Sequence, residues 1–249
     1  MRLSIITVCY NSEKTIENAL QSVAMQRGAA VEHIVVDGAS TDGTTKILEA
    51  YRHQLAHVIS EPDCGIYDAM NKGVRVASGD VIGFLNSDDA YSDESVLARV
   101  GDAMERHHLD ALFGDVAFYH PERPDRMVRR YSSARFQPNR VAWGWMPAHP
   151  ALFVRREVFQ NAGLFKPDYR IAGDFEFVAR AFRRPDLRYR YFPEVLVKMR
   201  FGGVSTGGWR NTMLLNKEVL RACKENGIPT NMLKILSKYP AKLLEYLRK

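Results

Sequence analysis

The architecture of this chain is decided by residues 3–26, LSIITVCYNSEKTIENALQSVAMQ. Residues 3–10 form an almost continuous apolar run, which is typical of a strand buried on both faces of a sheet. Residues 12–26 then place apolar side chains at helical spacing, and Asn11 or Ser12 is suited to cap the first turn of that helix. A buried strand followed at once by an amphipathic helix predicts one unit of an α/β fold.

The same strand–helix unit recurs along the first half of the chain. The predicted strands are residues 33–38, 57–60 and 80–87, and the predicted helices are residues 44–55, 68–77 and 93–108. This alternation predicts a mostly parallel central sheet with helices on both faces. Because ligands of such sheets bind outside the carboxyl ends of the strands, we expect one crevice there, lined by residues 7–11, 37–43, 60–65 and 86–89.

The second half of the chain is less regular. Its predicted elements are strands at 110–119 and 126–132, helices at 154–163 and 172–184, two short strands on either side of Pro193, and a helix within 229–249. This pattern predicts a smaller mixed sheet followed by a helical C-terminal tail.

Composition narrows the class of protein. The 249 residues suit one large domain, and the longest apolar runs are far shorter than the about 20 residues of a membrane span. We find no pattern typical of a signal peptide at the N-terminus. Cys9, Cys64 and Cys223 lack metal-type spacing, which favours a reduced, cytoplasmic protein. The net charge of +6 favours an anionic partner or membrane surface.

Two motifs at strand ends carry polar side chains. In VDGASTDGTT, residues 36–45, Asp37 closes a strand and is not needed as the cap of the next helix, so its carboxylate could accept hydrogen bonds from a nucleobase or a ribose. The alternative is a plain strand–helix turn. In DCGIYDAMNKG, residues 63–73, Asp68 and Lys72 lie one turn apart, and Lys72 could meet a phosphate or simply face water.

The stretch FLNSDDAYSDE, residues 84–94, ends an apolar strand in two adjacent carboxylates. Like charges at that position repel each other and lose solvation, unless a cation lies between them. Asp88 and Asp89 are the kind of ligands that a hard divalent cation prefers, and such a cation can neutralise a diphosphate. The alternative is that Asp93 caps the next helix while Asp88 and Asp89 lie in water.

Four motifs together resemble the nucleotide-binding half of family 2 glycosyltransferases: TVCYN (7–11), VVDGASTDGT (35–44), GIYDAMNKG (65–73) and FLNSDDAY (84–91). Within that family the chain most resembles the bacterial exopolysaccharide and O-antigen branch, which includes the colanic acid glycosyltransferases. The resemblance covers residues 3 to about 205. It implies a GT-A fold over residues 1–206, with a nucleotide-binding half at 1–110, an acceptor half at 111–206 and an extension at 207–249.

The resemblance also implies an activity and roles for residues. The family uses a nucleotide-sugar donor with Mn²⁺ or Mg²⁺ and inverts the anomeric centre in a single displacement. It implies that Asp37 holds the nucleoside, Asp88 the ribose and sugar side, and Asp89 the metal ion. Thr7 and Asn11 are expected near the base and the ribose.

An inverting transfer needs a general base on the acceptor hydroxyl. The family takes this base from an acidic pair at the start of a helix, which matches AGDFEF, residues 172–177. Asp174 stands at the matching place, although it would also serve as a helix cap. The second acid is replaced by Phe175, and Glu176 is the alternative base.

Other positions match the branch less closely. His149 is expected in the donor or acceptor pocket, and Trp145, with Trp143, could stack on a pyranose ring or belong to the core. Arg200 could reach the diphosphate or face water. The histidine that often ligates the metal in this family is replaced by glycines 202 and 203, and Met70 stands where the family often has arginine, so we expect Lys72 to take over that contact.

The sequence therefore predicts an inverting, metal-dependent glycosyltransferase. The expected donor is UDP-linked, and the expected acceptor is a lipid-linked oligosaccharide. The alternative is a non-catalytic binding protein that keeps the nucleotide crevice within a polysaccharide assembly complex. A sugar nucleotidyltransferase is disfavoured because CYNSEK, residues 9–14, lacks a Gly-rich loop. The basic, apolar segment 229–249 suits either an anionic membrane surface or packing on the domain, and we expect no nucleic acid partner.

Overall fold

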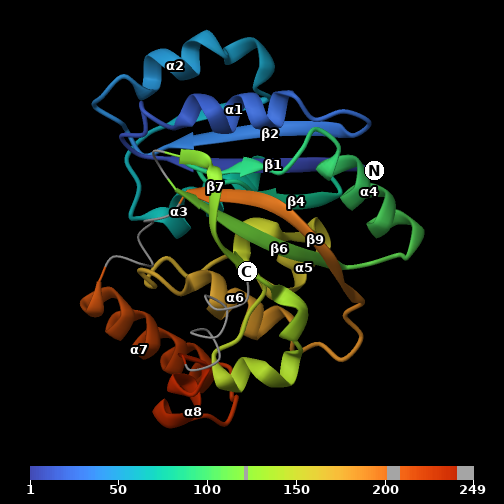
Figure 1. Ribbon diagram of the computed structural model, residues 1–249, viewed down its shortest axis with the longest axis vertical. Helices are drawn as coiled ribbons and strands as arrows, with labels where there is room; N and C mark the ends of the chain where they lie inside the picture. The colour runs from blue at the N-terminus through green and yellow to red at the C-terminus, as the bar shows by residue number, and fades with distance from the viewer. Residues whose placement is uncertain (121–122, 201–207, 240–249) are drawn as a thin grey trace.

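The computed structural model describes residues 1–120, 123–200 and 208–239, apart from the side chains of residues 124–126. Its first half alternates strands and helices as the sequence predicts (Figure 1). The elements are β1 (Arg2–Cys9), α1 (Ile16–Ala24), β2 (Ala30–Asp37), α2 (Thr44–Ala50), β3 (His57–Ser60), α3 (Ile66–Val76), β4 (Val81–Phe84), β5 (Ala90–Tyr91) and α4 (Val96–Arg106).

The second half adds the remaining strands and the C-terminal helices. These elements are β6 (Ala111–His120), β7 (Arg123–Tyr131), β8 (Leu152–Arg155), α5 (Arg156–Ala162), α6 (Gly173–Ala181), β9 (Tyr189–Arg200), α7 (Trp209–Glu225) and α8 (Met232–Leu236). Short 3₁₀ turns occupy 52–54, 133–135, 138–143 and 149–151. Gly163 ends α5, as predicted.

The strands form one sheet in the order β3-β2-β1-β4-β8-β6-β9-β5, with β7 paired to β6. β1 runs parallel to β2 and β4, and β2 runs parallel to β3, so the predicted parallel sheet is confirmed. The mixed strands of the second half extend this same sheet, because β8 pairs antiparallel with both β4 and β6. β6 and β9 run parallel to each other.

Helices cover both faces of the sheet. Alternate residues of β1 face opposite clusters: Leu3 and Ile5 pack with α4, whereas Ile6 and Val8 pack with α3 and α6. Figure 1 shows α1 and α2 on one side of β1 and β2, and α5 and α6 on the other. This two-sided burial explains why the strands read as continuous apolar runs.

Two predicted elements differ in the structure. Residues 189–200 form one strand, β9, through Pro193 rather than two short strands. The register of β9 against β6 shifts on both sides of Asp115, and this irregularity accommodates a proline that has no N–H to donate. At the C-terminus, helix is described only over residues 232–236, and the rest of the predicted helix lies partly outside the described residues.

The short helix α8 folds back on α7. The Nδ2 atom of Asn216 donates to Tyr239 Oη at 2.7 Å, and Ile235 is fully buried. Across the described ranges, no helix has both the length and the apolar character that crossing a bilayer requires.

Candidate active site

The carboxyl ends of the first three strands meet at one level. Cys9 of β1 pairs with Asp37 of β2, and Asp37 pairs with Ser60 of β3. β4 ends beside them at Phe84, and Asp88 and Asp89 follow within one turn. The Oγ atoms of Ser12 and Ser87 lie 3.0 Å apart and join the loops that leave β1 and β4. The strand-end motifs therefore lie along one edge of the sheet, as predicted.

Asp89 is buried, with 1% of its surface exposed. Its Oδ2 atom accepts a hydrogen bond from Asn86 Nδ2 at 2.9 Å, but its Oδ1 atom is enclosed and has no partner among the described residues. Burial and the charge of Asp88 raise the pKa of Asp89 to about 8. Burial also raises the pKa of Asp88, and Arg200 opposes that shift.

The alternative of two solvated carboxylates is therefore wrong for Asp89. Asp93 does not cap α4: its Oδ1 atom accepts from the backbone N–H of Ser95 at 2.9 Å in the turn before the helix, Ser95 is the N-cap residue, and no side chain caps the first turn. A buried carboxylate with an unpartnered oxygen beside a second carboxylate fits a divalent cation, which would replace the missing solvation. No third His, Cys, Asp or Glu of the described residues joins this pair in a metal-type cluster.

Asp37 is fully buried and well supplied with donors. Its carboxylate accepts from the backbone N–H of Ser40, from Ser40 Oγ and, at 2.7 Å, from Ser60 Oγ. In this structure it holds the β2–α2 turn against β3, and a contact with a nucleoside stays a prediction. Tyr10, within the predicted lining residues 7–11, is 64% exposed just beyond β1.

Thr7 and Asn11 have different surroundings. Thr7 is fully buried within β1, and its Oγ1 atom lies 3.0 Å from His33 Nε2. Its side chain is enclosed on one face of the sheet, and its expected place near the base and the ribose stays a prediction. Asn11 is exposed and adopts a φ of 49°. Its Oδ1 atom accepts from the backbone N–H of Thr41 at 2.8 Å, so Asn11 joins the loops after β1 and β2 at the crevice edge.

The start of α3 also lies at this edge. Gly65 precedes the helix with a φ of 116°, a value that favours glycine. Asp68 accepts from the backbone N–H of Cys64 at 3.1 Å. Lys72 contacts Glu61 at 2.9 Å and the backbone oxygen of Pro62 at 2.7 Å, so its ammonium group is tied to the β3–α3 loop. A contact between Lys72 and a phosphate stays a prediction.

The second half contributes Asp174 from the first turn of α6. This half-buried carboxylate accepts from the backbone N–H of Phe175 at 2.8 Å, and its Oδ1 atom lies 3.2 Å from Tyr67 Oη. A Cβ atom on Gly173 would lie 2.8 Å from the ring of Tyr67, so only glycine allows α3 and α6 to approach this closely.

The rival carboxylate, Glu176, has a different environment. It is fully buried and forms ion pairs with Arg180 at 2.8 Å and Lys166 at 3.2 Å. Such a paired, enclosed carboxylate has a structural role. Of the two candidates for the general base, Asp174 is the one that keeps access to solvent.

His149 links the two halves of the site. Its ring stacks on Phe84, at the end of β4, with centroids 5.1 Å apart. Its Nε2 atom is enclosed and has no partner among the described residues. Burial lowers the pKa of His149, while the charge of Asp174 opposes that shift. His149 therefore lies between the end of β4 and the start of α6.

The two tryptophans do not form a common sugar platform. Trp145 is 8% exposed, in agreement with the core alternative. Trp143 is 43% exposed, and Lys234 of α8 lies 5.6 Å from its ring centroid. Trp143 therefore belongs to the C-terminal surface, and stacking of Trp145 on a sugar stays a prediction.

Arg200 ends β9 on the other side of Asp88. A cleft of about 550 Å³ opens here between α1 and β9 and includes Asp88 and Arg200 in its lining. Glycines 202 and 203 stand in place of the metal-binding histidine that the family often has. Both residues lie outside the described part of the chain.

Comparisons with known proteins agree with this geometry. Residues 4–186 match the model of glycosyl transferase family 2. A PGL/p-HBAD biosynthesis glycosyltransferase of Mycobacterium bovis (strain BCG / Pasteur 1173P2) is 32% identical over 223 residues, which cover 88% of this chain and 82% of the relative. An uncharacterized glycosyltransferase, EpsJ of Bacillus subtilis (strain 168), is 31% identical over 201 residues, which cover 74% of this chain and 57% of EpsJ.

Solved structures share the fold. S. aureus TarS 1-349 in complex with UDP-GlcNAc has a TM-score of 0.67 at 22% identity, covering 88% of this chain and 67% of TarS 1-349. The mannosyltransferase PcManGT from Pyrobaculum calidifontis, in complex with GDP-Man and Mn²⁺, has a TM-score of 0.62 at 20% identity, covering 88% of this chain and 64% of PcManGT. This chain spans about two thirds of those chains. It has the GT-A fold, and it belongs to glycosyl transferase family 2.

Proposed function

We propose that the protein is a metal-dependent, inverting glycosyltransferase. It transfers a hexose or an N-acetylhexosamine from a nucleotide sugar to a sugar hydroxyl of a lipid-linked oligosaccharide in bacterial surface polysaccharide synthesis. The observation that carries the proposal is the enclosed Oδ1 atom of Asp89, which lies beside Asp88 and has no partner among the described residues, at the sheet edge where the family binds its donor. A binding protein without catalysis would have no need for Asp174 in the same crevice.

Different residues of the chain have different roles in the proposed reaction. Asp89 and Asp88 would hold a divalent cation, which supplies positive charge beside the diphosphate of the donor. Asp174 accepts the proton of the acceptor hydroxyl as that oxygen forms its bond to the anomeric carbon. The bond from that carbon to the diphosphate oxygen breaks on the opposite face, which inverts the centre. Tyr67 and the N-terminus of α6 hold the Asp174 carboxylate in one direction.

The donor is proposed to be UDP-linked. TarS, which shares the fold, was solved with UDP and with UDP-GlcNAc, whereas PcManGT was solved with GDP-Man and Mn²⁺. These two neighbours carry different nucleotides, so donor choice rests on pocket contacts rather than on the fold.

The test is a screen of UDP-, GDP- and dTDP-sugars for nucleotide release with Mn²⁺ or Mg²⁺. We expect release with a UDP-sugar, loss of release in EDTA, and loss of release in Asp89→Asn. Asp102→Asn, an exposed carboxylate on α4, is the matched control and should keep activity. Full activity in EDTA would refute the metal, and tight UDP binding without turnover on any acceptor would support the non-catalytic alternative.

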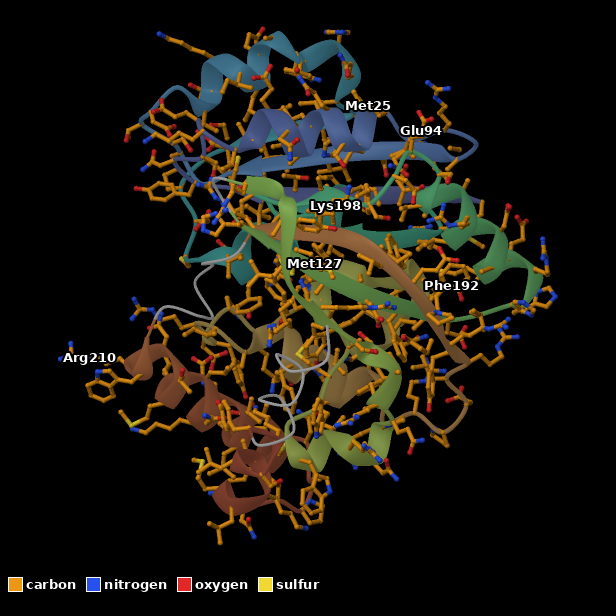
Figure 2. The ribbon with its side chains drawn as sticks, viewed as in Figure 1. Met25, Glu94, Met127, Phe192, Lys198 and Arg210 are labelled. Atoms are coloured by element: carbon orange, nitrogen blue, oxygen red, sulfur yellow. The ribbon has the colours of Figure 1, made fainter. Side chains whose placement is uncertain are left out.

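A peripheral position on the cytoplasmic membrane is part of the proposal. Trp209 at the start of α7 is 69% exposed and Leu233 of α8 is 80% exposed, and Arg210 and Lys234 stand beside them in the chain. Figure 2 shows Arg210 at the start of α7, pointing away from the body of the protein. Exposed apolar and basic side chains together suit an anionic membrane surface.

Sedimentation with anionic and neutral liposomes tests this part. We expect the wild type to pellet with anionic liposomes and the double variant Trp209→Ser/Leu233→Ser to stay in the supernatant. Met127→Ser, at an exposed methionine of β7, is the control and should behave as the wild type. Equal pelleting of all three proteins would remove the membrane role.

A further inference from the structure

The cleft between α1 and β9 extends away from the predicted donor site. Four parts of the chain enclose its about 550 Å³. α1 flanks it for about 14 Å, the length of nine helical residues. Figure 2 shows Met25 and Glu94 on the α1 side and Lys198 opposite them on β9. Its lining includes Lys14, Asn18, Met25, Tyr91, Lys198 and Arg200.

The charges that line this cleft favour an anion. Two of its acidic residues are already paired, because Arg99 contacts Asp93 at 2.9 Å and Arg27 contacts Glu94 at 2.9 Å. The cations Lys14, Lys198 and Arg200 form no ion pair with any carboxylate of the described residues. Lys198 lies 5.9 Å from the ring centroid of Tyr119, and Arg200 interacts with the charge of Asp88. An anionic group in the cleft would therefore meet Lys14 and Lys198 without breaking an ion pair.

Polar and apolar side chains also line the cleft. Tyr91 is 5% exposed, and its ring stacks on Phe153 with centroids 6.5 Å apart, so it forms part of the buried wall. Asn18 adds an exposed amide, and Met25, 61% exposed, adds an apolar surface. Amide and apolar groups side by side are suited to a sugar.

The position of the cleft points to the second substrate. It shares Asp88 and Arg200 with the predicted donor site but includes none of Tyr10, Asp37 or Asp68. We propose that this cleft holds a segment of the acceptor that carries an anionic group next to its sugars, with Lys14 and Lys198 binding the anion and the Asn18 amide a sugar hydroxyl. The inference rests on the proposed function and names the chemistry of its acceptor. The anion is either a carboxylate of an acidic sugar or the phosphate that links a glycan to its lipid.

Calorimetric titration of the full chain, saturated with UDP and Mn²⁺, tests the proposal with three probes. A hyaluronan hexasaccharide carries carboxylates, a farnesyl-diphosphate-linked N-acetylglucosamine carries phosphates, and chitohexaose is neutral. We expect one of the two anionic probes to bind at least tenfold more tightly than chitohexaose, and its identity distinguishes the carboxylate from the phosphate. Lys14→Ala/Lys198→Ala should weaken that binding about tenfold or more, because hydrogen bonds to charged groups contribute about 1.5–3 kcal/mol.

Matched variants separate binding from folding. Lys46→Ala/Lys217→Ala removes the same charge from exposed lysines of α2 and α7 and should bind the anionic probe as the wild type does. Asn18→Ala should bind it about 3–10-fold more weakly because the variant loses the amide, while the melting temperature of the unliganded protein should not fall because Asn18 is exposed.

Three results would overturn the proposal: no anionic probe binds although UDP does, chitohexaose binds as tightly as both anionic probes, or Lys14→Ala/Lys198→Ala keeps full affinity. The titration of UDP alone tests the proposed function, separately from the acceptor cleft. Failure of UDP to bind the wild type would count against the proposed function itself.

Discussion

The hydroxyl oxygen of Tyr67 lies 3.2 Å from Oδ1 of Asp174 and 2.7 Å from the backbone oxygen of Ile171. Tyr67 belongs to α3 of the nucleotide-binding half, and Asp174 belongs to α6 of the second half. This contact therefore holds the proposed base against the half of the protein that binds the donor. Glu218 of α7 holds the same loop from the other side, because its carboxylate accepts from the backbone N–H groups of Arg170, Ile171 and Ala172 at 2.8–2.9 Å.

We predict that Tyr67→Phe lowers kcat about 3–10-fold and leaves the affinity for UDP unchanged. The single hydroxyl proton is shared between the Ile171 backbone oxygen and the Asp174 carboxylate. Its loss is worth about 0.5–1.5 kcal/mol, and here it would act on the direction of the base rather than on donor binding. Steady-state kinetics with isothermal titration of UDP checks this. Tyr51→Phe, whose hydroxyl bonds to Gln21 and Glu17 at the surface, is the control. A variant with full kcat would show that Tyr67 has only a packing role.

Asp174→Asn and Glu176→Gln should fail in different ways. Asp174→Asn keeps the shape of the side chain but cannot take a proton, so we expect kcat to fall by roughly 10²–10⁴ with UDP binding and stability kept. Glu176→Gln leaves Arg180 and Lys166 without their buried partner, so we expect a loss of stability of about 1–3 kcal/mol. Chemical denaturation and single-turnover kinetics on both variants separate the two outcomes. If Glu176→Gln were the inactive, stable variant, the base would be Glu176.

Asp89→Asn should abolish metal binding and stabilise the metal-free protein. In the absence of a cation the charged form of Asp89 is buried beside Asp88, and the amide removes that charge at nearly constant size. In EDTA at pH 9 we expect a higher melting temperature for the variant than for the wild type. Added Mn²⁺ should raise the melting temperature of the wild type and of Asp102→Asn, but not that of Asp89→Asn. An equal response to Mn²⁺ in all three proteins would place the metal elsewhere.

The stability of the protein should fall in acid because of Glu32. This buried carboxylate accepts from Ser78 Oγ at 2.7 Å and from Ser4. Burial alone would raise the pKa of Glu32, but hydrogen bonds from Ser4 and Ser78, with Arg2 nearby, lower it to about 2. A lowered pKa means that this stabilisation is present above pH about 4.5 and is lost as the pH falls towards about 2.

Glu32→Gln should therefore lower the free energy of unfolding at pH 7 by about 3 kcal/mol or less and flatten its dependence on pH in that window. Urea denaturation at several pH values measures both quantities. Glu49→Gln, at an exposed position of α2, should leave the pH profile unchanged. A wild-type profile that is flat between pH 4.5 and 2 would contradict the assignment.

The local pattern of apolar and polar residues in the sequence determined much of the fold. The apolar runs of β1, β2 and β4 predicted buried parallel strands, because a strand covered on both faces needs apolar side chains in both directions. The positions of Asp37, Asp88 and Asp89 at one edge followed from the same rule, because parallel strands place all their carboxyl ends together. The end of the predicted helix 154–163 at Gly163 also matches the structure, in which Gly163 follows the last residue of α5.

Only the tertiary structure decided which of these side chains are available. Thr7 and Glu176 carry the right chemistry in the sequence, yet long-range packing buries the first against His33 and pairs the second with Lys166 and Arg180. Asp174 is distinguished from Glu176 by a contact with Tyr67, which is 107 residues away in the chain. The cleft beside α1 depends on β5 and β9 meeting across the sheet, and no local pattern contains that pairing. Hydrophobic periodicity indicates which face of a helix or strand is covered. The exposure of a site side chain, its hydrogen-bond or ion-pair partners and its direction depend on neighbours that are distant in the sequence.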